Sequence, residues 1–186
     1  MEDVVEPMSD NQVKRESNRT QARAAALLND DKGRFLAELA PAVQRLAART
    51  GLPASAVLAQ AILESNWGRS ALARQAHNLF GIKARRGARA SATFNTTEYE
   101  GGEARREAAR FAAYASYEDC LGDYARVLAH PRYLRARRVA ANPLAFVVEL
   151  QRAGYATDPH YAHKLALLIR RYRLTQYDVP RKEPTP

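Results

Sequence analysis

The chain has 186 residues, and its 29 lysines and arginines against 20 acidic residues give a net charge of +9. A domain of this size needs no disulfide or metal staple, because roughly 150 residues already bury about 70% of their unfolded surface. The single Cys120 excludes an internal disulfide, and no apolar run is long enough to insert into a membrane. The positive charge indicates polyanionic partners as a class, which includes nucleic acid, anionic lipid and an acidic cell wall.

Polar segments bound the expected domain at both ends. Residues 1–31 are rich in charged and amide side chains and lack the apolar stretch of a secretory signal, so we expect a flexible arm or linker there. Residues 177–186 carry three prolines, which is typical of a loose tail. The folded domain is therefore expected over residues 32–176.

Two helices are predicted at the start of this domain. Apolar residues recur at helical spacing from Phe35 to Leu46, and Gly51 ends that helix. Leu52-Pro53 opens a second helix, since proline suits a first turn. The second helix is expected to bury Val57, Leu58, Ala61 and Ile62, and to end near Trp67-Gly68 with Gly68 as its C-cap.

One segment breaks the helical pattern. Ser91 to Tyr99 is rich in threonine and aromatic residues, Gly101-Gly102 follows, and an alternating stretch runs on to Tyr114. This order predicts a β-hairpin with a slightly long loop.

Helices return after the hairpin. Ser116 is a predicted N-cap, Asn142-Pro143 opens a further helix that Gly154 closes, and Asp158-Pro159 opens the last one. The fold class is therefore α+β, a mainly helical body with a small β-hairpin lobe.

Glu64 is the first candidate for chemistry. It lies within a turn of a predicted helix C-terminus, beside apolar Leu63 and Trp67. The carbonyls at a helix end carry partial negative charge, and both that charge and apolar burial disfavour a carboxylate. A raised pKa would keep the proton that a general acid for glycosidic cleavage must donate. The alternative is an ordinary surface glutamate near a helix end.

Glu98 is the second candidate. It lies on the predicted hairpin, and two carboxyl groups on facing elements are the usual arrangement of a glycosidase. The alternative is an ion pair with a hairpin arginine, Arg105 or Arg106. No cofactor is expected, because the chain has no glycine-rich phosphate loop and its histidines have no supporting carboxylate spacing for a metal. Those histidines are His77, His130, His160 and His163.

Four ordered motifs resemble glycoside hydrolase family 73 over about residues 33 to 175. They are Leu58–Gly68, Asn78–Lys83, Thr96–Gly102 and Gly154–Tyr161. The resemblance implies a lysozyme-like fold with a small β-lobe flanking a cleft. It also implies hydrolysis of the β-1,4 bond between N-acetylglucosamine and N-acetylmuramic acid in peptidoglycan.

The resemblance also implies roles for single residues. Glu64 matches the general acid, Glu98 matches the hairpin carboxylate that is assigned as the second catalytic group, and Tyr155 matches a tyrosine near the reacting sugar. Asn66 stands where the family commonly has glycine. Further candidates for lining the cleft and binding substrate are Trp67, Asn78, Phe80 and Tyr124, of which Trp67 and Phe80 could equally be core residues.

Partners follow from the same resemblance. Peptidoglycan glycan strands are the expected substrate, flagellar rod proteins are a second expected partner, and no nucleic acid is expected. Action in the periplasm would then require export without a visible signal peptide, by the flagellar export route. Two alternatives stay open: a lytic transglycosylase, and a non-catalytic cationic module that binds the cell wall or the rod.

Overall fold

A computed structural model describes residues 31–85, 90–100 and 103–178. The chain divides into two compact units, Met1–Ala37 and Glu38–Pro186. Of the first unit the structure describes only the start of a helix, where Arg34 forms an ion pair with Asp31. The predicted arm, apart from Asp31, and all of the predicted tail except its first two residues lie outside the described residues.

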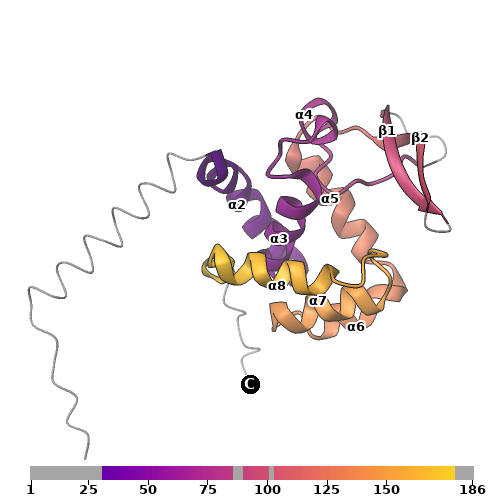
Figure 1. The fold of residues 1–186 in the computed structure, drawn as a ribbon. Coiled ribbons are helices and arrows are strands. Elements are labelled where there is room, and N and C mark those ends of the chain that lie inside the picture. The colour runs from indigo at the N-terminus through magenta and orange to yellow at the C-terminus, as the bar shows by residue number, and fades with distance from the viewer. Residues whose placement is uncertain (1–30, 86–89, 101–102, 179–186) are drawn as a thin grey trace, which may run out of the picture. The chain divides into compact units, whose positions relative to one another are not determined.

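The described elements confirm the α+β class, a helical body with one two-stranded antiparallel sheet at its side (Figure 1). No helix among these residues is both long enough and apolar enough to cross a membrane. In chain order the elements are α2 (Asp31–Thr50), α3 (Ala54–Ser65), α4 (Ala71–Ala76), β1 (Ser91–Glu100), β2 (Glu103–Ala112), α5 (Tyr117–Leu128), η1 (Pro131–Tyr133), α6 (Leu134–Arg138), α7 (Pro143–Arg152), α8 (Tyr161–Arg171) and η2 (Leu174–Tyr177).

Helix α3 is the central element of the second unit. Every residue from Ala54 to Ile62 is buried, and α7, α8 and η2 all contact this helix. A helix that is enclosed on all sides must be apolar all round, which explains the run of alanines among larger aliphatic residues. The predicted buried stripe is therefore correct but too narrow. Burial on every face fixes the position of α3, and with it the position of Glu64 in its last turn.

The end of α3 lies earlier than the sequence predicts. The C-cap is Asn66, which has a left-handed backbone with φ 50°, rather than Gly68. Trp67 and Gly68 are left-handed as well, with φ 61° and 71°. Asparagine tolerates this conformation better than other non-glycine residues. The chain therefore leaves the helix sharply, directly after Glu64 and Ser65.

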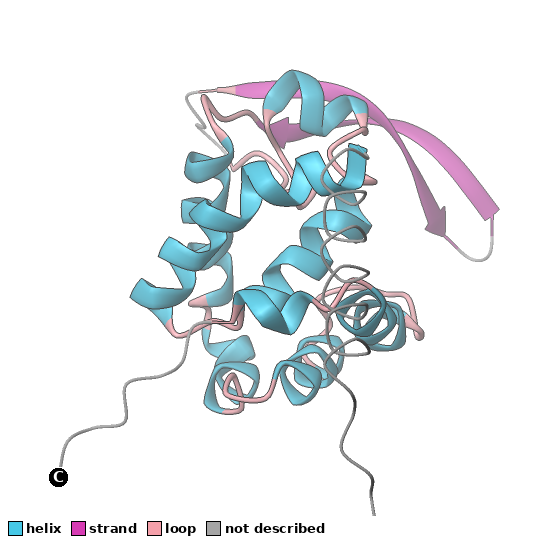
Figure 2. Ribbon diagram, turned by 90° about the vertical axis from the view of Figure 1, so that its left-hand side faces the viewer, coloured by secondary structure: helices cyan, strands magenta, loops and turns pink. Residues whose placement is uncertain are grey.

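The predicted hairpin is confirmed, although its connection is shorter than expected. Strands β1 and β2 pair in register from Ser91 opposite Ala112 to Glu100 opposite Glu103, so two residues join them. The base of the hairpin is tied to the loop after α4. The backbone N–H of Ala112 donates to the Ile82 carbonyl at 2.9 Å. Figure 2 shows the two strands extending away from the helices beyond this attachment.

Two of the predicted helix starts are confirmed by their caps. The Ser116 hydroxyl accepts from the Asp119 N–H at 3.2 Å, and the Asn142 side chain accepts from two N–H groups in the first turn of α7. The last helix begins later than predicted, at Tyr161. Asp158 accepts from the His160 N–H at 2.8 Å in the turn before it. The short helices α4 and α6 were not predicted, because they are too brief to show a periodic pattern.

The N-terminus of α3 is capped from the other end of the chain. Pro53, at the N-cap position, supplies no side-chain hydrogen bond. Instead the Asp178 carboxylate accepts from the Ser55 N–H at 2.8 Å. An acceptor at this place satisfies one of the free N–H groups of the first turn, and its charge complements the helix dipole. Asp178 is thus part of the folded domain.

We expect Asp178→Ala to destabilise the protein by about 1 kcal/mol, the usual loss when a helix N-terminus loses its capping side chain. The measurement is urea unfolding followed by circular dichroism. Asp178→Asn keeps an oxygen acceptor and is the matched control, so it should retain most of the stability. Equal losses in both variants would show that charge, and not the hydrogen bond, is the stabilising feature.

Candidate active site

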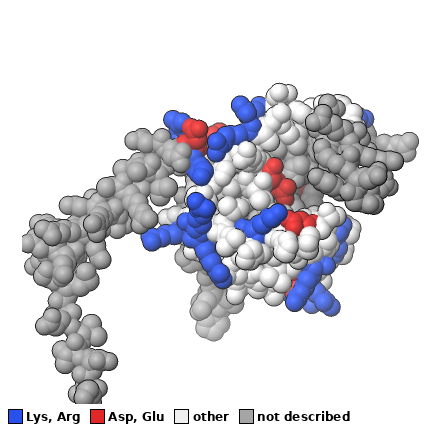
Figure 3. All heavy atoms as spheres, in the orientation of Figure 1, with Lys and Arg blue, Asp and Glu red and all other residues white. Residues whose placement is uncertain are grey.

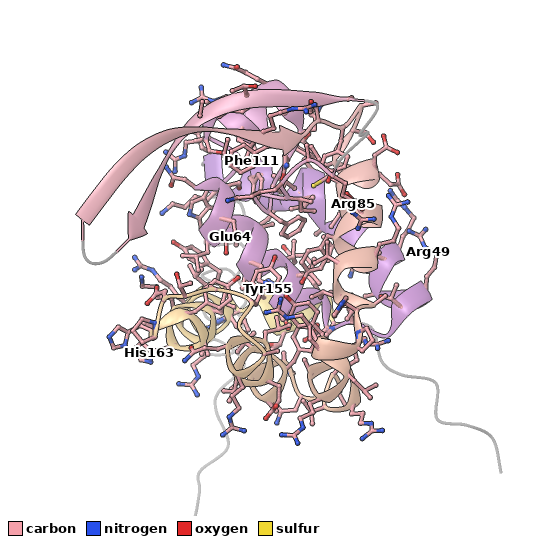
Figure 4. The ribbon with its side chains drawn as sticks, turned by 90° about the vertical axis from the view of Figure 1, so that its right-hand side faces the viewer. Arg49, Glu64, Arg85, Phe111, Tyr155 and His163 are labelled. Atoms are coloured by element: carbon pink, nitrogen blue, oxygen red, sulfur yellow. The ribbon has the colours of Figure 1, made fainter. Side chains whose placement is uncertain are left out.

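Glu64 lies at the end of the central helix, next to aromatic side chains from other elements (Figure 4). Its Oε1 atom accepts a hydrogen bond from the Tyr161 hydroxyl at 2.9 Å. The side chain is open to solvent, and among the described residues it forms no ion pair. Glu64 is therefore a solvent-accessible carboxyl whose direct partner is a neutral donor.

The pKa of Glu64 is raised above its ordinary value. Burial by the surrounding protein is the larger effect, and the hydrogen bond from Tyr161 opposes it by stabilising the carboxylate. The direction confirms the prediction from the sequence, and burial is the cause that the structure identifies. The proton is therefore held to a higher pH than on a fully hydrated glutamate.

Tyr155 belongs to the same cluster. Its ring stacks on that of Tyr161 with a centroid separation of 5.7 Å, and lies 6.0 Å from that of Tyr133. Burial, followed by the neighbouring acidic groups, raises the pKa of Tyr155 well above its ordinary value, so its hydroxyl stays protonated. Arg132 fixes the turn before Tyr155 by donating to the carbonyls of Ala153 and Gly154. The fold thus brings Glu64 and Tyr155 together from distant parts of the chain.

Two polar residues of this cluster were not predicted as site residues, namely Gln60 and Tyr161. Gln60 is fully buried and donates to the Tyr161 hydroxyl at 2.9 Å. Its sequence signal was a lone amide in an otherwise apolar helix, one turn before Glu64 and hence on the same face. Tyr161 stands in the last of the four motifs, where it was expected only as part of a helix.

Three candidate substrate-binding residues are covered by protein. Tyr124 is 0% exposed, and its ring stacks on Phe80, which is 6% exposed, at 4.1 Å. The Tyr124 hydroxyl donates to Gln60 Oε1. Asn78 is 1% exposed. In this structure these residues support the site from within the core, and they do not offer surface to a ligand as expected.

The Asn78 side chain forms four hydrogen bonds with backbone groups. Its amide donates to the carbonyls of Ile82 and Ala112, each at 2.9 Å. Its oxygen accepts from the N–H groups of Phe80 at 3.3 Å and Ile82 at 3.0 Å. Asn78 therefore joins the loop after α4 to the base of the hairpin.

The roles predicted for Trp67 in substrate binding and for Glu98 as the second catalytic group remain predictions. Trp67 is half-buried, with its ring edge-on to Tyr172 at 4.6 Å. Glu98 lies on β1 opposite Arg105 of β2, and its side chain lies outside the described residues. A catalytic Glu98 and a Glu98 paired with Arg105 or Arg106 thus both remain predictions.

The described residues hold no cluster of histidine, cysteine, aspartate or glutamate that could bind a metal ion. Cys120 is buried, and burial raises the pKa of its thiol to about 12. On the face shown in Figure 3, the basic side chains form several separate groups.

We expect Glu64→Gln to raise the melting temperature at pH 7, at most by about 2–4 °C. The raised pKa means that folding favours the protonated carboxyl, so this contribution is complete at low pH and is lost as the pH rises through the folded pKa. Glutamine mimics the protonated form at every pH. Calorimetry at pH 4 and pH 7 should show the gain only at the higher pH, and a gain that is equal at both would contradict it.

Comparison with known proteins agrees with this geometry. A family model for glucosaminidases, described as mannosyl-glycoprotein endo-beta-N-acetylglucosaminidase, matches residues 40–174. The peptidoglycan hydrolase FlgJ of Pseudomonas aeruginosa is 47% identical over 150 residues, which are 76% of this chain and 37% of that protein. The chain thus spans well under half the length of this relative.

Two solved structures share the fold. The catalytic domain of the autolysin Auto from Listeria monocytogenes has a TM-score of 0.73 at 36% identity, covering 93% of this chain and 100% of that one. The truncated glycoside hydrolase domain of Salmonella typhimurium FlgJ has a TM-score of 0.64 at 41% identity, covering 77% of this chain and 98% of that one. With a family match over most of its length, the chain belongs to the glucosaminidase family, glycoside hydrolase family 73.

Proposed function

We propose that this domain hydrolyses peptidoglycan at the β-1,4 bond between N-acetylglucosamine and N-acetylmuramic acid, with Glu64 as the general acid. The observation that carries the proposal is the state of Glu64, a solvent-accessible carboxyl with a raised pKa and a neutral hydrogen-bond partner. An acid of this kind keeps its proton to a higher pH than a fully hydrated glutamate and can approach a substrate. The names of the relatives, peptidoglycan hydrolase FlgJ and autolysin Auto, support the cell wall as the substrate.

In the proposed mechanism, Glu64 protonates the leaving glycosidic oxygen while positive charge develops on the sugar ring that carries the anomeric carbon. The bond between the anomeric carbon and that oxygen breaks, and a water molecule supplies the hydroxyl group of the new reducing end. Tyr155, whose protonated hydroxyl belongs to the ring stacked on Tyr161, would stabilise the developing charge. Trp67 is the remaining candidate for a sugar contact, since its side chain is only half-buried.

The role proposed for Glu98 is in the second step, in which water attacks the sugar. A carboxylate on the hairpin would act as the general base or nucleophile of the two-carboxylate mechanism. If Glu98 does not reach the sugar, the acetamido group of the substrate would take this role. The retaining or inverting outcome follows from which of these groups acts.

A role in the assembly of the flagellar rod is the wider part of the proposal. The FlgJ relatives motivate it, with rod proteins as partners and the periplasm, reached through the flagellar export route, as the place of action. Local cleavage of glycan strands would open the cell wall for the growing rod. The net charge of +9 would favour contact with an anionic wall.

Glu64→Gln should abolish the release of soluble fragments from purified sacculi, with at least a hundredfold loss of rate, because glutamine has no proton to donate. Turbidity loss is the measurement, and circular dichroism checks the fold. Mass spectrometry of wild-type products tests the reaction class, since a lytic transglycosylase yields anhydro-sugars that lack one water per cut. Full activity of the variant would refute the assignment, and binding of sacculi without any cleavage by the wild type would identify a non-catalytic module.

Glu98→Gln separates the two routes for the second step. If Glu98 activates water, the variant should lose about 10²–10⁴-fold in kcat, the range of general acid–base catalysis. Addition of azide to a Glu98→Ala variant should then restore turnover if Glu98 is a nucleophile or base, because the truncated side chain leaves space in which a small anion can replace the lost carboxylate. Near wild-type kcat would instead assign the second step to the substrate's acetamido group.

A further inference from the structure

A buried hydrogen-bond array lies behind Glu64. It consists of Tyr124 from α5, Gln60 from α3 and Tyr161 from the first turn of α8, and we call it the Gln60 array. Gln60 and Tyr124 are 0% exposed and Tyr161 is 2% exposed. Three helices therefore converge on one side-chain amide in the core, where a polar group without partners would destabilise the fold.

The donors and acceptors of the array run in one direction. The Tyr124 hydroxyl donates to Gln60 Oε1, and Gln60 Nε2 donates to the Tyr161 oxygen at 2.9 Å. Because Tyr161 already accepts from Gln60, its own proton is available for Glu64 Oε1, which lies 2.9 Å away. The amide thus converts a buried tyrosine at one end into a hydrogen-bond donor aimed at the carboxyl at the other end.

We propose that the Gln60 array presents a fixed donor to Oε1 of Glu64, so that the transferable proton resides on Oε2 and the carboxylate left by its transfer is stabilised at once. This proposal rests on the proposed role of Glu64 as the acid. An oxygen that accepts a hydrogen bond is the carbonyl oxygen of a protonated carboxyl, which leaves the hydroxyl on the other oxygen. Gln60, Tyr124 and Tyr161 are positioning residues, since they act on the reaction through Glu64.

The bond to Tyr161 is expected to strengthen during the reaction. When Glu64 gives up its proton it becomes an anion, and hydrogen bonds to charged groups are stronger than those between neutral groups. The array then contributes more to the transition state than to the bound substrate, which is the condition for raising kcat. The same hydrogen bond lowers the pKa of Glu64 and so opposes the effect of burial.

The described titratable groups that interact with Glu64 are neutral. They are Tyr124 from α5, Tyr155 from the turn after α7 and Tyr161 from α8. Burial raises the pKa of each of these three phenols, so they stay protonated over the working pH range. Among the described residues no lysine, arginine or histidine takes part in setting the pKa of Glu64.

The direct test is Tyr161→Phe, which keeps the ring and removes the donor. The Glu64 carboxyl pKa, followed by carbon NMR of the folded protein, should rise by about one unit, since the carboxylate loses a charge-assisted hydrogen bond. In sacculus digestion, kcat should fall about tenfold or more with KM unchanged. The alkaline limb of the kcat profile should move up by the same amount, because activity requires the protonated acid.

Tyr114→Phe is the matched control. The Tyr114 hydroxyl also donates to a carboxylate, that of Asp123 at 2.8 Å, but it is not part of the array. The loss of this tyrosine hydroxyl should leave the pKa of Glu64 and the position of the alkaline limb unchanged. If Tyr114→Phe moved them as much as Tyr161→Phe does, the effect would be general and the proposal would be overturned.

Tyr124→Phe tests the direction of the array and serves if Tyr161→Phe does not fold. Without the Tyr124 proton, Gln60 Oε1 is free to turn toward Tyr161 and compete for its hydroxyl. The pKa of Glu64 should then rise by less than one unit, although Tyr124 does not touch Glu64. An unchanged pKa in a folded Tyr124→Phe variant would contradict a directed array.

The two proposals fail in different ways. An active Glu64→Gln enzyme would refute the role of Glu64 as the acid, while the NMR shift in Tyr161→Phe would still be expected. An inactive Glu64→Gln enzyme together with an unchanged pKa of Glu64 in Tyr161→Phe would refute the array alone. A uniform loss of activity in Tyr161→Phe, with lower thermal stability but no shift of the alkaline limb, would assign the residue a purely structural role.

Discussion

The hydrogen bond from Tyr161 to Glu64 balances two opposing requirements on the pKa of the Glu64 carboxyl. Partial burial of the Glu64 carboxyl disfavours its anion, yet an acid catalyst must become an anion once per turnover. Burial raises the pKa of Glu64 and the Tyr161 hydroxyl lowers it. Because a shift of one unit corresponds to about 1.4 kcal/mol, a single well-placed donor can change the balance between the two protonation states by tenfold.

The surroundings of Glu64 achieve this balance without a charged partner among the described residues. A lysine or arginine beside the carboxyl would stabilise the carboxylate and release its proton well below neutral pH. Tyrosines offer hydrogen bonds while remaining neutral, and their rings also exclude water from one side of the group. The stacking of Tyr155 on Tyr161 shows how closely these rings share the space beside Glu64.

The rigidity of the site depends on contacts between residues far apart in the chain. Asp178 caps the start of α3, whose last turn carries Glu64. Asn78 ties the loop after α4 to the base of the hairpin that carries Glu98. Each contact satisfies buried or helix-terminal backbone groups that have no partner in their own element. The elements that carry Glu64 and Glu98 are therefore held by two separate sets of hydrogen bonds, from Asp178 and from Asn78.

Local signals in the sequence were enough to predict the longer helices, the hairpin and the caps of α5 and α7, and they singled out Glu64 as the candidate acid. Apolar periodicity, asparagine and serine before helical runs, and a glutamate at an apolar helix end are all visible within a few residues. The core positions of Tyr124 and Phe80, and the contacts of Gln60 and Tyr161 beside Glu64, depend instead on how the helices pack. Packing between helices decides where such a side chain points and which partner it meets. Gln60 and Tyr161, for example, lie 101 positions apart in the chain. No local pattern encodes such a meeting, since the same tyrosine in the same helical turn would face solvent if α8 crossed α3 at a different angle.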